Sequence, residues 1–362
     1  MNINRPTLLL NKEQVIPNIR KMAAKATRHD LFFRPHFKTH QSRMIGEWFR
    51  EEGVTGITVS SVAMAEYFQE AGWQDITIAF PCNIREYEKI DQLAGKCDLK
   101  ILVVNTEAVQ FLKEKLKNRL FFLIEIDNGY HRTGLDTEDQ VGIDKILAVI
   151  GKCDLIKFKG FLTHAGNSYH AHDLEEIKNI HRNTLDQLHN LKAKYKGAFP
   201  DMIISLGDTP CCSLLDDFDG VDEIRPGNFV FYDLMQEQIG SCRMEEIAVA
   251  LACPVVAKNE NRLEIAVYGG AIHLSKEYIL DKAGSKQYGR IVQLNDNGWS
   301  APVPKASVIS LSQEHGIIKT EKEFFDQILV GDVIGILPVH SCLTADAIGE
   351  YLTLEGEKID HY

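Results

Sequence analysis

The feature that most constrains the fold is a regular alternation of two kinds of segment between residues 31 and about 230. Short apolar runs rich in β-branched residues alternate with stretches of helical periodicity such as 139–150 and 175–191. The apolar runs are Leu31–Lys38, Gly56–Ser61, Asp75–Pro81, Leu99–Asn105, Leu120–Asp127, Leu155–His164, Asp201–Gly207 and Val221–Phe229. Eight strands alternating with helices predict an α/β fold of the TIM type, a (β/α)8 barrel. A doubly wound open sheet is the competing fold, but no GxGxxG turn follows an early strand.

A change in texture after Ser241 predicts a second domain. The strand candidates there are Ile247–Ala257, Arg262–Gly270, Gln287–Leu294, Lys305–Ser312 and Asp332–Pro338, which are joined by turns with little helix between them. We therefore expect a barrel over residues 11–240 and a C-terminal β domain over residues 241–362. The opening run Arg5–Leu10 also predicts a strand. Pairing of residues 1–10 with the β domain is one option for it.

Composition and charge exclude several classes of protein. The chain has 362 residues, is 44% hydrophobic, and has a net charge of −11 from 40 basic and 51 acidic residues. An acidic balance argues against binding to nucleic acid, and no apolar run approaches the ~20 residues needed to span a bilayer. Without a signal-peptide pattern, and with eight scattered cysteines, the sequence predicts a cytoplasmic protein with reduced thiols.

Lys38 is the first candidate for chemistry. It ends the first apolar run, after Arg34 and His36, and the active sites of barrels lie at the carboxyl ends of their strands. Nearby positive charge and partial desolvation would favour the neutral amine, which is the form that attacks a carbonyl carbon. The alternative is an ordinary surface lysine after an edge strand.

The ends of the later strands supply matching groups. Arg132 follows the fifth run, His164 ends the sixth, and Arg225 lies in the eighth. Donors suited to a phosphate group are Ser205, Gly207, Thr209 and the backbone of Gly227 and Asn228. Together with Lys38 these groups describe a pocket for a phosphorylated aromatic aldehyde, namely pyridoxal 5′-phosphate.

Motifs along nearly the whole chain resemble a known family. They are Arg34-Pro-His-Phe-Lys38-Thr-His40, Glu125-Ile-Asp127-Asn-Gly129 with Arg132-Thr-Gly134, Arg225-Pro-Gly227 with Tyr232, Gln313-Glu-His-Gly316 and Pro338-Val-His340-Ser-Cys342. The chain resembles the D-threonine aldolase/D-serine dehydratase family of fold type III, the alanine-racemase-like pyridoxal-phosphate enzymes. The resemblance implies that Lys38 bonds to the cofactor, Arg132 approaches its phenolic oxygen and His164 lies against the ring. It also implies that Arg225 faces the ring nitrogen. The groups implied around the phosphate are Ser205, Gly207, Thr209, Gly227 and Tyr232.

The resemblance also implies a metal, held by His340 and Cys342. These residues are two positions apart, so on a strand both would point to one face. Imidazole and thiolate suit Zn²⁺, with Mn²⁺ or another divalent ion as alternatives. Members of dehydratase type resemble this HxC pattern, whereas members of aldolase type carry an aspartate at the second position.

Three positions depart from the family pattern. Tyr268 and His273 stand near where these enzymes usually have an aspartate and a lysine, and Gln313 replaces a glutamate. These departures leave the cofactor residues intact and leave the substrate open. His315 is either a site residue or a turn histidine.

The sequence therefore predicts a lyase dependent on pyridoxal phosphate and Zn²⁺ that acts on a D-configured 3-hydroxy amino acid, with D-serine dehydratase-type elimination. The alternatives are D-threonine aldolase-type cleavage, an amino-acid racemase of the same fold, or a barrel protein that carries the cofactor without catalysis. The resemblance implies a homodimer that binds a small-molecule D-amino acid.

Overall fold

The computed structural model describes residues 2–151 and 153–362, which pack into two compact units. The barrel unit comprises residues 21–38 and 49–227. The sheet unit comprises residues 39–48 and 228–362 together with the described residues up to Arg20. These limits follow from packing within each unit, and the domain limits 11–240 and 241–362 stay a prediction.

Eight parallel strands form the main sheet of the barrel unit and confirm the predicted barrel architecture. They are β2 (Phe32–Phe33), β3 (Ile57–Val59), β4 (Asp75–Pro81), β5 (Asp98–Val103), β6 (Leu120–Asp127), β8 (Ile156–Thr163), β9 (Ile203–Leu206) and β10 (Glu223–Ile224). Their order is β2-β10-β9-β8-β6-β5-β4-β3, and the short β7 (Leu135–Asp136) pairs with β6. A parallel bridge between His36 and Thr58 brings the segment after β2 beside β3, so the first and last strands of this order adjoin.

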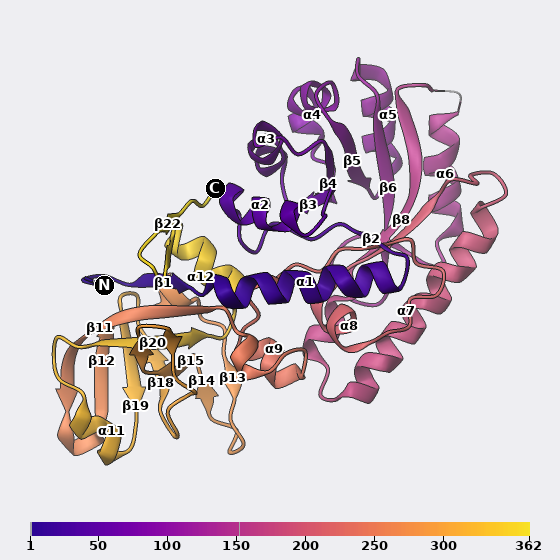
Figure 1. Cartoon of the computed structure of the whole chain (residues 1–362). Coiled ribbons are helices and arrows are strands. Elements are labelled where there is room, and N and C mark those ends of the chain that lie inside the picture. The colour runs from indigo at the N-terminus through magenta and orange to yellow at the C-terminus, as the bar shows by residue number, and fades with distance from the viewer. Residues whose placement is uncertain (1, 152) are drawn as a thin grey trace. The chain divides into compact units, whose positions relative to one another are not determined.

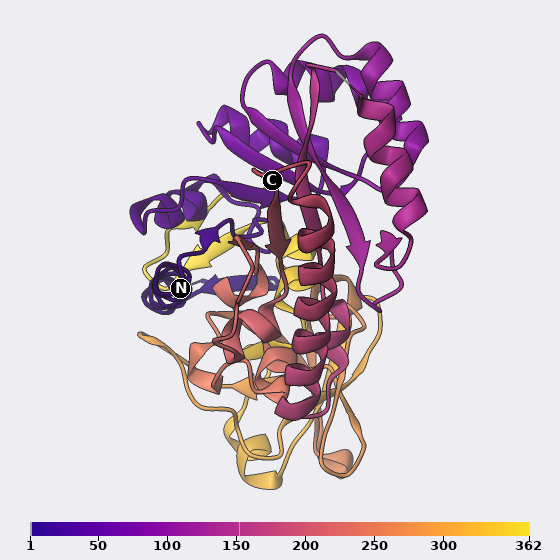
Figure 2. The same cartoon turned by 90° about the vertical axis from the view of Figure 1, so that its right-hand side faces the viewer.

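Helices lie outside these strands, and the long α7 runs along them (Figures 1 and 2). They are α3 (Val62–Glu70), α4 (Tyr87–Ala94), α5 (Thr106–Lys115), α6 (Gln140–Ile150), α7 (Leu174–Tyr195) and α8 (Thr209–Leu214). Side-chain caps begin several of them: Asn105 accepts from the Ala108 N–H at 2.9 Å, and Asp173 accepts from the Glu176 N–H at 2.8 Å. Each such cap stabilises its helix by about 1 kcal/mol. Across the described ranges, no helix combines the length and the hydrophobicity needed to cross a membrane.

The core of the barrel unit includes a layer of leucines from neighbouring strands. Leu102, Leu123 and Leu162 are each at most 1% exposed and pack together, with Ala79 and Ile203 against them. Burying a leucine side chain contributes about 1.5–3 kcal/mol. The strands of a barrel are buried on both faces, which explains why their sequences read as continuous apolar runs.

The first and last strands are shorter than the sequence predicts. The run Leu31–Lys38 keeps only β2 as regular strand, because Pro35 has no N–H for the ladder. Lys38 consequently lies in a turn after the His36 bridge. The run Val221–Phe229 likewise keeps only β10 before Pro226.

The sheet unit contains a nine-stranded, mainly antiparallel sheet, which confirms a C-terminal β architecture. Its strands are β1 (Thr7–Leu10), β11 (Val249–Asn259), β12 (Glu264–Tyr268), β15 (Gly289–Val292), β18 (Ser307–Leu311), β19 (His315–Lys319), β20 (Val333–Pro338), β21 (Tyr351–Thr353) and β22 (Lys358–Ile359). Two small hairpins pair β13 (Ile279–Leu280) with β14 (Lys286–Gln287) and β16 (Leu294–Asn295) with β17 (Gly298–Trp299). Strand β1 pairs antiparallel with β11, with Leu8 opposite Leu251, and parallel with β21.

The α-helices that lie wholly in the sheet unit, among the described residues, are α9 (Leu234–Ile239), α10 (Ala271–Leu274), α11 (Lys322–Gln327) and α12 (Ser341–Ile348). Helices α1 (Lys12–Arg28) and α2 (Arg43–Glu51) each contribute residues to both units.

Candidate active site

Lys38 stands on a rigid base. Its neighbour Phe37 is buried and contacts three aromatic rings, with centroid distances of 5.0 Å to Phe49, 5.0 Å to Phe68 and 5.2 Å to Trp73. The Phe37 N–H donates to the carbonyl of Thr58 at 2.8 Å. The side chain of Lys38 itself is exposed. A fixed backbone below an accessible amine suits a lysine that bonds covalently to a ligand.

Four of the predicted site residues, Lys38, Arg132, His164 and Arg225, act on the charge of His36. Burial, followed by the charges of Lys38, Arg225, His164 and Arg132, lowers the pKa of His36 well below its ordinary value. Burial and the charge of Lys38, with smaller effects of Arg132 and Arg225, lower the pKa of His164 to about 3. Both histidines are therefore neutral near pH 7. Neutral His164 donates from Nδ1 to the carbonyl of Gly207. The fixed positive charge of this region belongs to the lysine and the two arginines and would attract an anionic ligand.

The loop after β6 orients Arg132. Its Nη2 lies 3.9 Å from a carboxylate oxygen of buried Glu125, and the Thr133 hydroxyl lies 2.9 Å from each oxygen of that carboxylate. Burial raises the pKa of Glu125, against the effects of Thr133 and Arg132. A Cβ on Gly134 would lie 2.8 Å from the backbone nitrogen of Asp127, and φ is 110° there, so the turn requires glycine.

The loop after β9 presents an unsatisfied hydroxyl. Thr209 is 0% exposed, and its Oγ1 has no hydrogen-bond partner among the described residues. The Thr209 N–H donates to the Tyr169 hydroxyl at 3.1 Å. A Cβ on Gly207 would lie 3.0 Å from Cβ and 3.1 Å from the carbonyl oxygen of Arg225, so glycine lets the ends of β9 and β10 approach. A buried donor without a partner beside positive charge is what a phosphate site needs.

Ser205 and Arg225 are joined to each other. The Ser205 hydroxyl donates to Glu223 at 2.6 Å and accepts from Nε of Arg225 at 2.6 Å. Nη2 of Arg225 donates to the carbonyl of Thr163 at 2.6 Å. The Ser205 hydroxyl is therefore committed to this network, and a phosphate at this place would meet the backbone of Ser205.

The barrel unit thus fits pyridoxal phosphate. Lys38 supplies an amine, and His164 supplies a neutral, half-buried ring. Arg132 and Arg225 supply cationic donors, and Thr209 supplies an orphaned buried hydroxyl. These are the groups that a flat, phosphorylated aldehyde requires. Gly227 is the last residue of this unit, whereas Asn228 and Tyr232 belong to the sheet unit.

His340 and Cys342 are placed by a helix. The prediction that both lie on one face of a strand is wrong, because β20 ends at Pro338 and His340 is the N-cap residue of α12. The two side chains still meet. Burial opposes a charged imidazole, but the hydrogen bond and charge of Cys342 raise the pKa of His340 to about 9. Burial likewise opposes the thiolate, but His340 and Thr39 lower the pKa of Cys342. This pair offers a nitrogen and a sulfur ligand.

Polar neighbours support Cys342. The Thr39 hydroxyl lies 3.3 Å from the sulfur atom, and Nδ2 of Asn228 lies 3.5 Å from it. Asp233 accepts from Asn228 at 2.6 Å and from the Ser341 N–H at 2.9 Å, which ties these residues together. Among the described residues, His340 Nδ1 and Asn228 Oδ1 are buried without a partner, and no cluster of three His, Cys, Asp or Glu side chains could hold a metal. A nitrogen and a sulfur donor of this kind would supply two ligands to a metal ion.

Two of the off-pattern residues form their own contact. The rings of Tyr268 and His273 lie 5.7 Å apart and are nearly perpendicular, and Tyr268 is opposite His315 in the β12–β19 register. His273 Nδ1 accepts from the Gly270 N–H at 3.1 Å, and burial lowers the pKa of this imidazole. Helix α10, which carries His273, packs against α12. Tyr232 is 2% exposed, with a left-handed φ of 49°.

Sequence reasoning missed several residues that contact the candidates: His36, Glu125, Glu223, Thr39, Asp233 and the Asn228 side chain. Glu125 and His36 stand inside quoted motifs, so their position near strand ends was a usable signal. Glu223 and Asp233 gave no signal, because their importance depends on which strands and helices become neighbours.

Comparison with known proteins places the chain in a class. The family model described as "Alanine racemase, N-terminal domain" matches residues 10–234, more than half of the chain. The model described as "Putative serine dehydratase domain" matches residues 248–354. A barrel of the first type followed by a β domain of the second type defines a fold type III pyridoxal-phosphate enzyme.

Three relatives extend along nearly the whole chain. D-serine dehydratase of Dictyostelium discoideum is 30% identical over 98% of this chain and 94% of the relative. D-threo-3-hydroxyaspartate dehydratase of Delftia sp. (strain HT23) is 28% identical over 99% and 96%. 3-Hydroxy-D-aspartate aldolase of Paracoccus denitrificans (strain Pd 1222) is 24% identical over 99% and 90%. The chain therefore belongs to the family of the alanine racemase N-terminal domain, in its branch with a D-serine dehydratase-type second domain, as the motifs predict.

Solved structures agree with this placement. The structure of the Delftia dehydratase has a TM-score of 0.90 and 26% identity, and the match covers 100% of this chain and 98% of that one. Two further structures of a D-threo-3-hydroxyaspartate dehydratase carry a histidine-to-alanine and a cysteine-to-alanine substitution two positions apart. The cysteine variant is in a metal-free form.

Proposed function

We propose that this chain is a pyridoxal-phosphate-dependent lyase that converts a D-configured 3-hydroxy amino acid into a 2-oxo acid and ammonia. The observation that carries the proposal is the contact of His340 with Cys342, supported by Thr39 and Asn228. A histidine and a cysteine with the same spacing are the residues replaced by alanine in two structures of a D-threo-3-hydroxyaspartate dehydratase. Two relatives, at 30% and 28% identity, are themselves named dehydratases.

The residues of the barrel unit that would hold the cofactor are Lys38, Arg132, His164, Gly207, Thr209, Arg225 and Gly227. The family resemblance adds the backbone of Asn228 and Tyr232. When bound, pyridoxal phosphate supplies a conjugated ring that accepts electron density from the substrate α-carbon. Lys38 would provide the amine that holds the cofactor, and its Nζ as a free amine would accept the proton from the substrate α-carbon. The Thr209 hydroxyl, which is buried without a partner, would donate to the phosphate.

Electrostatics prepare this pocket for its ligand. Burial and the charge of Lys38 lower the pKa of His164 to about 3, so it would meet the ring as a neutral imidazole without adding a positive charge. Arg225 is held by hydrogen bonds to Ser205 and Thr163, so its guanidinium is oriented before a ligand arrives, and Arg132 lies 3.9 Å from Glu125. Preoriented donors bind an anion without the cost of ordering them at that moment.

His340 and Cys342 would hold the metal, for which we propose Zn²⁺. The metal supplies a Lewis acid for the hydroxyl group of the substrate. The chain's own contribution is to present one imidazole nitrogen and one thiolate, with Thr39 and Asn228 as donors to the sulfur atom. Two protein ligands leave other positions for oxygen ligands.

Retro-aldol cleavage is the second candidate function. A relative at 24% identity is named an aldolase, and it matches 99% of this chain. Such an enzyme would use the same lysine to give glycine and an aldehyde.

Product analysis tests the proposal. Protein loaded with pyridoxal phosphate and zinc is incubated separately with D-serine, D-threonine and D-threo-3-hydroxyaspartate, and with L-serine as the stereochemical control. We expect 2-oxo acid and ammonia from at least one D-substrate, loss of this activity on chelation, and recovery with zinc. Glycine as the sole product would replace the dehydratase with the aldolase. Turnover of none of these D-amino acids would contradict the lyase assignment.

We further propose a homodimer that acts in the cytoplasm. The homodimer rests on the family resemblance, and the cytoplasmic location is supported by the eight cysteines, all of which are free thiols. Light scattering at micromolar concentration and fractionation of cells should find a dimer in the cytosolic fraction. A monomer, or protein confined to another fraction, would refute the respective part.

A further inference from the structure

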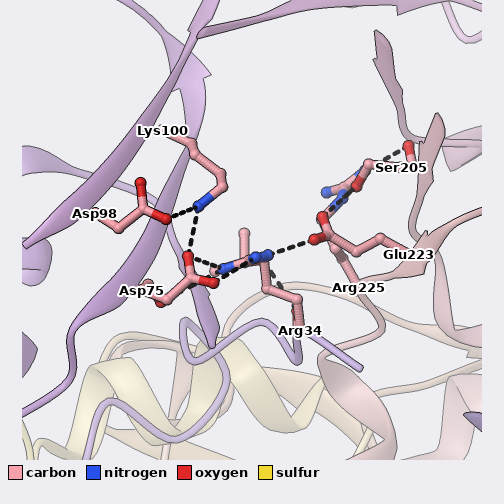
Figure 3. A network of polar contacts seen from close by, with 8 residues as sticks. Arg34, Asp75, Asp98, Lys100, Ser205, Glu223 and Arg225 are labelled. Carbon is pink, nitrogen blue, oxygen red and sulfur yellow. Dashed lines mark hydrogen bonds and ion pairs between the residues drawn. The ribbon is translucent and has the colours of Figure 1, made fainter. Parts of the chain in front are cut away.

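A continuous chain of polar side chains crosses the barrel unit from Asp98 to Arg225 (Figure 3). At its first end, Lys100 is 4% exposed and donates to Asp98 at 3.0 Å and to Asp75 at 2.6 Å. Asp75 and Asp98 are the first residues of the adjacent strands β4 and β5. This end of the polar network therefore lies at the amino-terminal edge of the barrel sheet, opposite the edge where the cofactor residues lie.

Arg34 is the central residue of this network of polar side chains. It is 3% exposed, and its Nη1 and Nη2 donate to the two oxygens of Asp75 at 2.6 and 2.9 Å. Its Nε donates to Glu223 at 2.5 Å. All three nitrogens of one guanidinium are thus engaged by two carboxylates. Such a bidentate arrangement fixes orientation as well as distance.

At the other end of the polar network, hydrogen bonds hold Arg225 in place. Glu223, which is 2% exposed, uses one oxygen for Arg34 and the other for the Ser205 hydroxyl, at 2.6 Å. Ser205 in turn accepts from Nε of Arg225 at 2.6 Å, and Nη2 of Arg225 donates to the carbonyl of Thr163. In the described part of the chain Nη1 of Arg225 donates to no residue, so this nitrogen is available to a ligand.

Strand register brings these residues together. Glu223 is opposite Ser205 on one side and Phe32 on the other, in the parallel order β2-β10-β9. Arg225 lies two positions after Glu223, so both side chains emerge on one face. The arrangement is therefore a product of the barrel itself.

Positive and negative charges are equal in number within this polar network. Three cations (Arg34, Lys100 and Arg225) face three carboxylates (Asp75, Asp98 and Glu223). Arg34, Glu223 and Arg225 are almost fully buried, and a buried charge that loses its partner is strongly unfavourable. Removing one carboxylate would therefore change the position or charge environment of the next arginine.

We propose that Arg34 and Glu223 are positioning residues which, through Ser205, hold the Arg225 guanidinium in one orientation for contact with the pyridine ring of the cofactor. This inference rests on the proposed function. It differs from a purely structural ion-pair network because the chain ends on Arg225, whose charge acts on His36 and Glu125 in the candidate site.

Comparing the binding of two ligands distinguishes the positioning of Arg225 from direct binding of the phosphate. Pyridoxal phosphate and pyridoxal, which lacks the phosphate, are titrated against wild-type protein, Glu223→Gln and Ser205→Ala. We expect both variants to bind each ligand at least about tenfold more weakly, because a hydrogen bond to a charged group is lost in each. The absorbance spectrum of the bound cofactor at fixed pH should also change in both. Ser205→Ala alters no charge and little volume, so it covers the case in which Glu223→Gln fails to fold.

Two control variants complete the design. Thr209→Val should weaken binding of pyridoxal phosphate and leave binding of pyridoxal unchanged, because its hydroxyl is assigned to the phosphate. Glu51→Gln, at an exposed position, should change neither affinity. Circular dichroism verifies that each variant is folded.

The outcomes are distinct. Folded Glu223→Gln and Ser205→Ala with wild-type affinities and an unchanged spectrum would overturn the positioning role. A Ser205→Ala defect confined to pyridoxal phosphate would overturn it as well, in favour of a phosphate contact. Failure of the wild-type protein to bind either ligand would instead refute the proposed function.

Discussion

The Cys342 sulfur atom has two hydrogen-bond donors, Thr39 at 3.3 Å and Asn228 at 3.5 Å. Such donors stabilise the thiolate that binds a metal and fix its direction. Thr39→Val removes one donor at nearly constant volume, and we expect the affinity for zinc to fall about tenfold. Competition with a chelating indicator measures this affinity. Thr27→Val, at an exposed position on α1, is the control. Equal zinc affinities of Thr39→Val and wild type would contradict the prediction.

His164 should make stability depend on pH. Its pKa is lowered from 6.5 to about 3 in the folded protein, so between these values the unfolded chain binds more protons. The free energy of unfolding therefore falls as the pH drops below about 6.5, and at pH 5 this histidine accounts for about 2 kcal/mol.

His164→Gln tests this effect, because its amide can still donate to the Gly207 carbonyl but does not titrate. Between pH 7 and pH 5, urea denaturation should show a loss about 2 kcal/mol smaller in the variant than in wild type. Exposed His172→Gln should behave as wild type. A loss in His164→Gln as large as that of wild type would show that the lowered pKa of His164 is not the cause.

Among the elements, the start of β3 depends on a glycine. A Cβ on Gly56 would lie 2.6 Å from Nη1 of Arg34 and 3.0 Å from Oδ2 of Asp75. Gly56→Ala should therefore disturb the buried ion pair and reduce the free energy of unfolding by about 2–4 kcal/mol. A Cβ on Gly197 meets nothing within 4 Å, so Gly197→Ala should stay within about 0.5 kcal/mol of wild type in the same urea titration. Similar stabilities of the two variants would argue against the tight packing of Arg34.

Element existence was more predictable than element geometry. The eight strands follow from apolar runs that must be buried on both faces, and the antiparallel sheet follows from short runs separated by turn residues. The predicted first strand, Leu31–Lys38, was too long because Pro35 interrupts its ladder of hydrogen bonds. His340 and Cys342 were assigned to a strand because a helix that begins at Ser341, three residues after Pro338, left no clear signal.

At the scale of the whole molecule, the sequence does not predict which residues far apart in the chain come into contact. Motifs identified Lys38, His164 and Arg225 as candidates, because their positions near strand ends place them at one edge of a barrel. The link from Arg34 through Glu223 to Arg225 joins residues up to 191 positions apart, from 34 to 225, and depends on the strand order β2-β10-β9. Only the folded chain shows that Ser205 is committed to Glu223 and that Asn228 reaches Cys342.

The central claim is that Lys38 carries pyridoxal phosphate. Borohydride reduction of the cofactor-loaded protein converts a lysine–cofactor bond into a stable linkage, and mass spectrometry of the peptides then locates it. We predict a single modified residue, Lys38, and loss of the label in Lys38→Ala. A label on another lysine, or no label on a protein that binds the cofactor, would contradict the account.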